Sequence, residues 1–298
     1  MHYGVSLPNN RGVASVRDLT DLAAYAERIG YESVWVSEHL MHATYVAERL
    51  GDRPYHEALT VLTAAAMTTS KALLGTSVLV LPWHHPARLA KMLATLDVLS
   101  EGRVVCGIGV AVTEDEYAAL GVPFKERGRI ADEMLDAMKA LWTQDVPEHH
   151  GHYYAFEGLR FEPKPLTKPH PPIWVGGNSP AALRRVVRHG DGWHPLSRSP
   201  AELRAMRAEL GDALDAAGRE TDKGMPLAVR LVVDFRDTPW ERPVEQRRTA
   251  RGTVEELRAL MAAYEEAGVT HIIVDAASGD VDEVRELWDH FRAEVIGG

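Results

Sequence analysis

Two acid–base side chains, Glu38 and His39, follow directly on the β-rich run 33–37. Histidine titrates near neutral pH, so His39 can take or give a proton during a redox step. The chain has 14 histidines, most of which we expect to be structural or exposed. The place of His39 at the end of a predicted strand sets it apart from that background, and we predict it to be catalytic.

A second cluster, Gly176, Gly177, Asn178 and Ser179, lies where the predicted strand 173–176 runs into a helix. The two glycines let the backbone come close to a ligand, and Ser179 followed by proline is suited to begin a helix. Exposed N–H groups at such a helix start bind anions, phosphate above all. A well-capped tight turn without a ligand is an equally simple interpretation of these residues alone.

Two further strand ends carry residues suited to a flat ligand. Trp83 follows the apolar run 73–80, where its ring can wall a planar ligand and exclude water, or simply cap the core. The run Gly107–Gly109 lacks the third glycine and the acidic residue of a dinucleotide-binding fingerprint, so we reject that interpretation. Gly109 then marks a strand end where another surface, such as a flat ring, approaches the backbone.

The remaining histidine groups do not indicate a metal site. His84–His85 and the cluster at 149–152 lack the carboxylate spacing of a helical zinc motif. The single cysteine, Cys106, can neither form an intramolecular disulfide nor build a thiolate metal site, which favours a reducing cytoplasm. We therefore expect no metal and a cytoplasmic location.

The charge and hydropathy patterns argue against several classes of partner. With 33 basic and 43 acidic residues the net charge is −10, which disfavours nucleic acid and anionic membranes. The N-terminus lacks the basic region and apolar stretch of a signal peptide, and no apolar run approaches the ~20 residues that span a bilayer. The expected partner is a small-molecule substrate.

The elements that must position these residues alternate along the chain. Short β-rich runs precede amphipathic stretches of helical spacing, as in a parallel sheet with crossover helices. Eight such units in 298 residues predict one α/β domain over 1–298, a (β/α)8 TIM barrel with its active site at the C-terminal strand ends. Insertions at that face are expected at about 41–53, 144–172 and 236–252, the second with a small hairpin. The predicted strands are 3–7, 33–37, 73–80, 104–109, 173–176, 192–194, 227–234 and 272–274, and the predicted helices are 16–29, 54–69, 86–99, 124–142, 180–189, 200–217, 254–267 and 281–295.

Several motifs in combination resemble the luciferase-like monooxygenase superfamily, and specifically its branch that uses the deazaflavin coenzyme F420. The resemblance runs from about residue 4 to residue 194, and the run GTVEEL at 252–257 is similar to the last third of the family. The motifs that carry it are WVSEH at 35–39, GTSVLVLP at 75–82, AKMLATLDVLSEGR at 90–103, GVPFKERGR at 121–129, GGNS at 176–179 and GDGWHP at 190–195.

The resemblance implies that the barrel binds F420 across its C-terminal mouth, with the phosphate near Gly176–Ser179. It also implies a bulge in the third strand, where a cis peptide between Ser77 and Val78 backs the central ring. His39 matches the acid–base position of several relatives, and Glu38 matches a neighbouring acid that contacts the ring. We expect Trp83, Val110, Trp193 and the insertions to line the substrate pocket.

The sequence departs from the family at one position. Relatives that oxidise glucose-6-phosphate carry a glutamate directly after the G-x-G of the fourth strand, and Val110 stands there in this chain. Valine cannot protonate a substrate, so we do not expect that specific activity. Glu114 and Glu116 lie a few residues further on, and the sequence leaves open whether either takes part in catalysis.

The leading hypothesis is an oxidoreductase that transfers a hydride between F420 and a small organic substrate. One alternative is an FMN-dependent monooxygenase of the same fold, which binds phosphate at the same end of the barrel. A second alternative, which Val110 keeps open, is a non-catalytic protein that binds the deazaflavin without turnover. We also expect a homodimer, which is the commonest symmetric assembly and is frequent in this family.

Overall fold

A curled parallel sheet is the centre of the molecule. The computed structural model describes residues 1–196, 198–236 and 249–297. The strands follow one another in the order β11-β10-β12-β1-β2-β3-β5-β8-β9, all parallel. A parallel bridge between Trp193 and Leu227 brings β9 back to the start of β10. The predicted (β/α)8 barrel is therefore confirmed.

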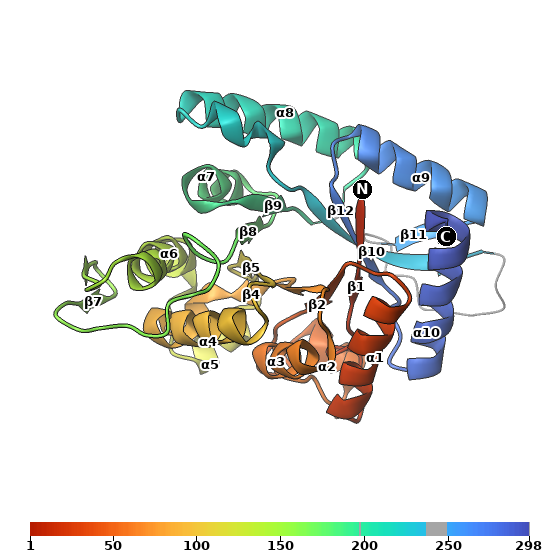
Figure 1. Cartoon of the computed structure of the whole chain (residues 1–298), viewed down its shortest axis with the longest axis horizontal. Coiled ribbons are helices and arrows are strands. Elements are labelled where there is room, and N and C mark those ends of the chain that lie inside the picture. Colours follow the sequence, from red (N-terminus) through yellow and green to blue (C-terminus); the bar gives the residue numbers. More distant parts are fainter. Residues whose placement is uncertain (197, 237–248, 298) are drawn as a thin grey trace.

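The helices lie around the outside of the strands, and the β6–β7 hairpin extends beside α6 (Figure 1). The strands are β1 (His2–Ser6), β2 (Ser33–Val36), β3 (Leu73–Thr76), β4 (Leu79–Val80), β5 (Val104–Gly109), β6 (His149–His150), β7 (Ala155–Phe156), β8 (Ile173–Gly176), β9 (Gly192–His194), β10 (Ala228–Phe235), β11 (Thr249–Gly252) and β12 (His271–Asp275). The helices are α1 (Val16–Arg28), α2 (Tyr45–Leu50), α3 (Ala58–Thr68), α4 (Pro86–Leu99), α5 (Glu114–Ala119), α6 (Arg127–Thr143), α7 (Pro180–His189), α8 (Pro200–Ala216), α9 (Val254–Glu266) and α10 (Val281–His290).

Two tryptophans fill the inside of the barrel. Trp35 of β2 and Trp174 of β8 lie with ring centroids 5.3 Å apart, in a cluster separate from the apolar layer between sheet and helices. Glycines make room for both rings, because a Cβ added at Gly75 would lie 2.2 Å from Trp35 and one at Gly192 would lie 2.5 Å from Trp174. The barrel is thus packed with side chains below its mouth, as small barrels are.

Local signals at the helix starts explain most of the helix boundaries. The Ser179 hydroxyl accepts a hydrogen bond from the Ala182 N–H and Pro180 opens α7, while α8 and α9 each begin with a capping box. Such caps satisfy N–H groups that have no partner within the helix. The helix predicted over 54–69 begins only at Ala58, because the Glu57 carboxylate accepts from the N–H groups of Leu59 and Thr60.

The predicted third strand, 73–80, is broken into β3 and β4. Three residues between the paired positions Gly75 and Leu79 lie opposite two residues of β5, which is a bulge. The Ser77–Val78 peptide bond within it is cis, as the family resemblance implied. Residues 77 and 78 therefore leave the regular ladder at the end of the strand.

The three predicted insertions have different outcomes. The segment 41–53 contains a short helix, α2, which the sequence analysis did not predict. The segment 144–172 carries the expected hairpin, since β6 and β7 pair antiparallel. In the third, 237–248 lie outside the described residues, and 249–252 form β11, which pairs parallel with the end of β10 and corrects the prediction of a loop there.

Two features are absent from the part of the chain that the structure describes. No helix in that part has the length and apolar character needed to cross a membrane. No group of three or more His, Cys, Asp or Glu side chains in the same part of the chain is placed to hold a metal ion.

A substitution at Gly107 of β5 would test how closely β5 must approach Thr76 of β3 beside the bulge. A Cβ built there would lie 1.7 Å from the Thr76 carbonyl oxygen, which is backbone and cannot turn away. We expect Gly107→Ala to lower the free energy of unfolding by about 1–3 kcal/mol or more, as overpacking does. Urea denaturation measures this. Gly224→Ala is the control, because nothing lies within 4 Å of its added Cβ, and equal losses in both variants would contradict the packing.

Candidate active site

The predicted site residues converge at one end of the barrel. Glu38 and His39 follow β2, Ser77 and Val78 lie between β3 and β4, and Gly109 ends β5. Carboxyl ends of parallel strands meet at the same edge, so residues distant in the chain surround one mouth. The arrangement expected from the sequence is therefore present, and the details below differ from it in several places.

Val78 occupies the space beside two of the predicted glycines. A Cβ added at Gly109 would lie 2.7 Å from Val78 Cγ2, and one at Gly176 would lie 3.0 Å from Val78 Cγ1. Both glycines are needed because the valine side chain packs on them. A flat ring at this wall would consequently rest against Val78 and not on the bare strand ends.

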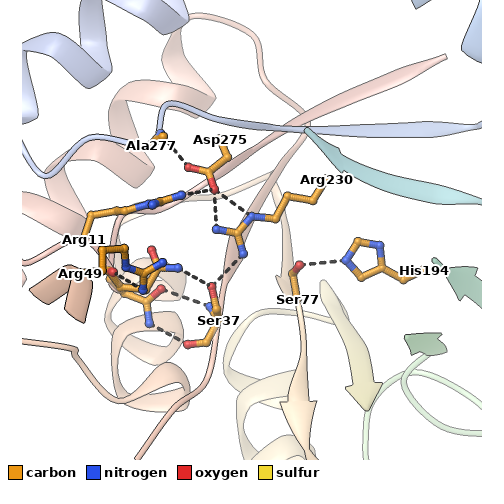
Figure 2. Close-up of polar contacts among 10 residues, drawn as sticks. Arg11, Ser37, Arg49, Ser77, His194, Arg230, Asp275 and Ala277 are labelled. Atoms are coloured by element: carbon orange, nitrogen blue, oxygen red, sulfur yellow. Dashed lines mark hydrogen bonds and ion pairs between the residues drawn. The ribbon is translucent and has the colours of Figure 1, made fainter. Parts of the chain in front are cut away.

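His194 fixes the hydroxyl of Ser77. Its Nδ1 lies 2.8 Å from the carbonyl oxygen of Ala228, which can only accept a hydrogen bond, so Nδ1 carries the proton. Nε2 is then left to accept from the Ser77 hydroxyl at 2.8 Å, a pair drawn in Figure 2. Sequence analysis missed His194 as a site residue, although it lies in the motif GDGWHP.

The structure corrects the expectation that Trp193 lines the substrate pocket. Strand side chains alternate in direction, and His194 takes the inward position on β9. Trp193 lies in the core between sheet and helices, 1% exposed. Its indole N–H donates to the carbonyl oxygen of Gly177 at 2.9 Å, so it supports the turn after β8 from behind.

The turn after β8 holds its own side chains tightly. Gly177 has a φ of +108°, a conformation that suits glycine. The Asn178 amide donates to the carbonyl of Leu196 at 3.2 Å and accepts from its N–H at 2.8 Å. Together with the Ser179 cap, these bonds give α7 a rigid start at the mouth of the barrel.

His39 is held by a buried carboxylate. Its Nδ1 lies 2.6 Å from Glu116 Oε2, and the Leu40 and Met41 N–H groups donate to Glu116 Oε1 at 2.9 and 3.1 Å. Burial by itself raises the pKa of Glu116, but the bonds from His39 and the two N–H groups outweigh it and lower the pKa. Of the two glutamates that the sequence left open, Glu116 is the one that reaches the histidine.

Aromatic rings surround His39. Trp83 and Tyr55 each lie with ring centroids 5.7 Å from it. Trp83 is 8% exposed, and its buried indole N–H has no hydrogen-bond partner among the described residues. The same tryptophan borders a cleft of about 310 Å³, whose other walls include Tyr153 and Tyr154. A small, largely apolar molecule fits such a wall.

Glu38 does not face the mouth as a free acid. Its side chain is almost fully buried, and its carboxylate accepts from the Val80 N–H at 2.6 Å and from His84 Nε2 at 2.8 Å. Burial lowers the pKa of His84, but the bond to Glu38 and the charges of Glu38 and Glu57 outweigh it and raise the pKa. Glu38 therefore ties β4 to the end of β2.

Val110 is half-buried against the core. Its carbonyl oxygen accepts from the Tyr117 hydroxyl at 2.5 Å, and its side chain offers no proton. Its predicted place in the substrate pocket stays a prediction.

Two arginines, Arg11 and Arg230, converge on Asp275 at the C-terminal end of β12 (Figure 2). Arg230 donates to Oδ2 at 2.6 Å and Arg11 donates to the same oxygen at 3.0 Å, while Arg230 also reaches the Ser37 hydroxyl at 2.9 Å. Burial raises the pKa of Asp275, but the arginines and the Ala277 N–H hold it well below its ordinary value. The sequence analysis missed this cluster, although a charged residue within the apolar run 228–233 was a signal for it.

Comparison with known proteins identifies the family. The profile of the luciferase-like monooxygenase family matches residues 1–248. The chain belongs to this family. The resemblance predicted from the motifs is thus confirmed at the level of the family, while the F420 branch within it stays a prediction.

The relatives include enzymes of both coenzyme types. Over 282 residues the chain is 30% identical to the FMNH(2)-dependent dimethylsulfone monooxygenase of Pseudomonas putida, covering 93% of this chain and 75% of that protein. Over 191 residues it is 32% identical to the F420-dependent glucose-6-phosphate dehydrogenase of Amycolatopsis mediterranei, covering 63% and 55%. An F420-dependent secondary alcohol dehydrogenase, solved with an F420-acetone adduct, has the same fold, with a TM-score of 0.81 at 19% identity over 99% and 98% of the two chains. The chain is accordingly an oxidoreductase of the luciferase-like family.

Glu38→Gln tests the pairing with His84. The amide oxygen can still accept from Val80, but the charge is lost, so we expect the pKa of His84 to fall. An NMR titration of the histidine ring measures this. The pKa of His84 is raised in the folded wild type. The stability that its pair with Glu38 contributes is therefore full at low pH, and it is lost as the pH rises through the pKa of His84. A stability difference that grows with rising pH would contradict the pairing.

Asp275→Asn tests the arginine cluster. Removing the charge leaves two buried guanidiniums without their counter-ion, so we expect a loss of about 3–5 kcal/mol in the free energy of unfolding. Glu294→Gln is the control, since its pair with Arg258 is exposed on both sides and worth under about 1 kcal/mol. The folded pKa of Asp275 is depressed, so the difference from wild type should shrink as the pH falls; urea melts at several pH values check it.

Proposed function

We propose that this protein transfers a hydride between coenzyme F420 and a small organic substrate, and that His39 carries the proton that accompanies it. The observation that supports this most is the bond between His39 and the buried carboxylate of Glu116 at the mouth of the barrel. A hydride exchanged at a carbon that bears oxygen requires a proton at that oxygen, and a carboxylate-backed imidazole is suited to move it.

The residues at the mouth fit a flat ring with a phosphate tail. Val78, packed on Gly109 and Gly176, offers an apolar surface for the ring, and Ser77 presents a hydroxyl held by His194. The rigid start of α7 at Ser179 leaves the positive end of the helix at the mouth, which would favour an anion there. When bound there, F420 supplies or accepts the hydride.

The chain contributes binding, orientation and the proton path. Glu116 holds His39 Nδ1 and so fixes the ring and its tautomer. Glu38 anchors β4 behind the ring seat by way of the Val80 N–H. Trp83 covers His39 on one side and keeps water from it. Substrate would enter beside Trp83, with Val110 as a second candidate wall.

Binding and turnover test the proposal directly. We expect F420 to bind the purified protein at micromolar concentration and to be turned over with a panel of small alcohols and carbonyl compounds. His39→Ala should keep the dissociation constant within about threefold and lower kcat by about 10²–10⁴-fold, because it removes a general acid–base group. His2→Ala, an exposed histidine at the N-terminal end of β1 and so at the other end of the barrel, should match the wild type. No binding of F420 below millimolar concentration would exclude this function.

An FMN-dependent monooxygenase is the second candidate. It is favoured by the 30% identity with the FMNH(2)-dependent dimethylsulfone monooxygenase, which extends over 93% of this chain. Oxygen consumption with reduced FMN and a candidate substrate, together with tighter binding of FMN than of F420, would support it. Tight binding of F420 with no turnover across the panel would instead support a non-catalytic binder.

A further inference from the structure

We propose that the Tyr45 hydroxyl is the group that touches the substrate oxygen, and that His39 acts through it as the middle of a relay from Glu116 to Tyr45. The inference rests on the proposed function, in which a substrate oxygen exchanges a proton. It changes which side chain is catalytic, because His39 becomes a positioning and relay residue behind Tyr45.

The hydrogen bonds of Glu116, His39 and Tyr45 are consistent with one arrangement of their protons. Glu116 Oε1 accepts from the Leu40 and Met41 N–H groups, and the lowered pKa keeps the carboxylate ionised, so it can only accept. His39 Nδ1, 2.6 Å from Oε2, must therefore donate to it. In the neutral ring Nε2 then carries a lone pair, and the Tyr45 hydroxyl 2.6 Å away donates to it.

Tyr45 lies closer to the solvent than His39 does. The His39 side chain is 13% exposed, whereas Tyr45 is 49% exposed. Tyr45 opens the short helix α2, which follows the C-terminal end of β2 in the insertion 41–53. Its ring meets that of His39 edge-on at 5.5 Å. A substrate that approaches Nε2 would find this nitrogen already bonded to the tyrosine oxygen.

Charges near Tyr45 favour its role in proton transfer. The guanidinium of Arg49, one turn further along α2, lies 5.9 Å from the Tyr45 ring centroid. A cation over the ring stabilises the negative charge that develops on the phenol oxygen while its proton moves. At the other end of the relay, the Glu116 carboxylate stabilises the imidazolium that forms on His39.

The step balances for an alcohol and its carbonyl product. On oxidation, the C–H bond breaks and its electron pair leaves as hydride to the oxidised deazaflavin, while a C=O bond forms. The alcohol proton passes to the Tyr45 oxygen as the Tyr45 proton passes to His39 Nε2. Carbonyl reduction by the reduced deazaflavin runs the same transfers backwards. The substrate class is therefore a small alcohol or carbonyl compound.

Tyr45→Phe keeps the ring and removes the oxygen. We expect it to lower the rate of hydride transfer by about 10²-fold or more, with the coenzyme dissociation constant unchanged. Combined with His39→Gln it should cause little further loss, since the two residues act as one unit. Tyr25→Phe is the matched control, because that hydroxyl donates to Asp289 between α1 and α10 in the helical layer; it should match the wild type.

A second readout needs no turnover. In the ¹⁵N-histidine-labelled protein without coenzyme, we expect His39 as the Nδ1–H tautomer, with its Nε2 signal shifted by Tyr45→Phe and not by Tyr25→Phe. An unshifted signal would overturn the relay. So would a Tyr45→Phe enzyme as active as the wild type while His39→Gln is inactive, a result that leaves the proposed function intact. A wild type that turns over no alcohol or carbonyl compound would overturn both.

Discussion

The parallel register of the barrel strands is the constraint on which the site depends. It brings the ends of β2, β3, β5 and β8 to one edge, although up to 140 residues separate them in the chain. Trp35 and Trp174 fill the barrel below that edge, and glycines on neighbouring strands give them room. Because side chains fill the interior, the polar groups that the strand ends and their loops supply are gathered at the mouth.

Buried carboxylates organise this mouth. Glu38, Glu116 and Asp275 are each nearly inaccessible, and each is compensated by charged or N–H donors from other segments. Burying a carboxylate is costly unless such donors surround it. The three acids therefore act as cross-links between segments, and Glu116 in particular fixes the position of His39.

Two residues that are adjacent in the sequence bond different partners at the end of β2. Glu38 and His39 point in different directions at the end of β2, so Glu38 bonds His84 while His39 bonds Glu116. The acid–base pair that the sequence suggests thus becomes two separate carboxylate–histidine pairs. One anchors β4 to the end of β2, and the other holds a histidine whose second nitrogen bonds Tyr45.

The sequence by itself determined the barrel, most element boundaries and the group of strand ends that form the mouth, because glycines, prolines, capping residues and apolar periodicity act within a few residues. Family motifs added the cis peptide at Ser77–Val78. Only the tertiary structure decided that Glu116 reaches His39 across 77 residues, that Arg230 pairs with Asp275, and that Trp193 faces the helices. These contacts follow from strand order, register and loop paths, which place side chains from separate segments together. Apart from the charged Arg230 within an apolar run, they leave no local pattern in the chain.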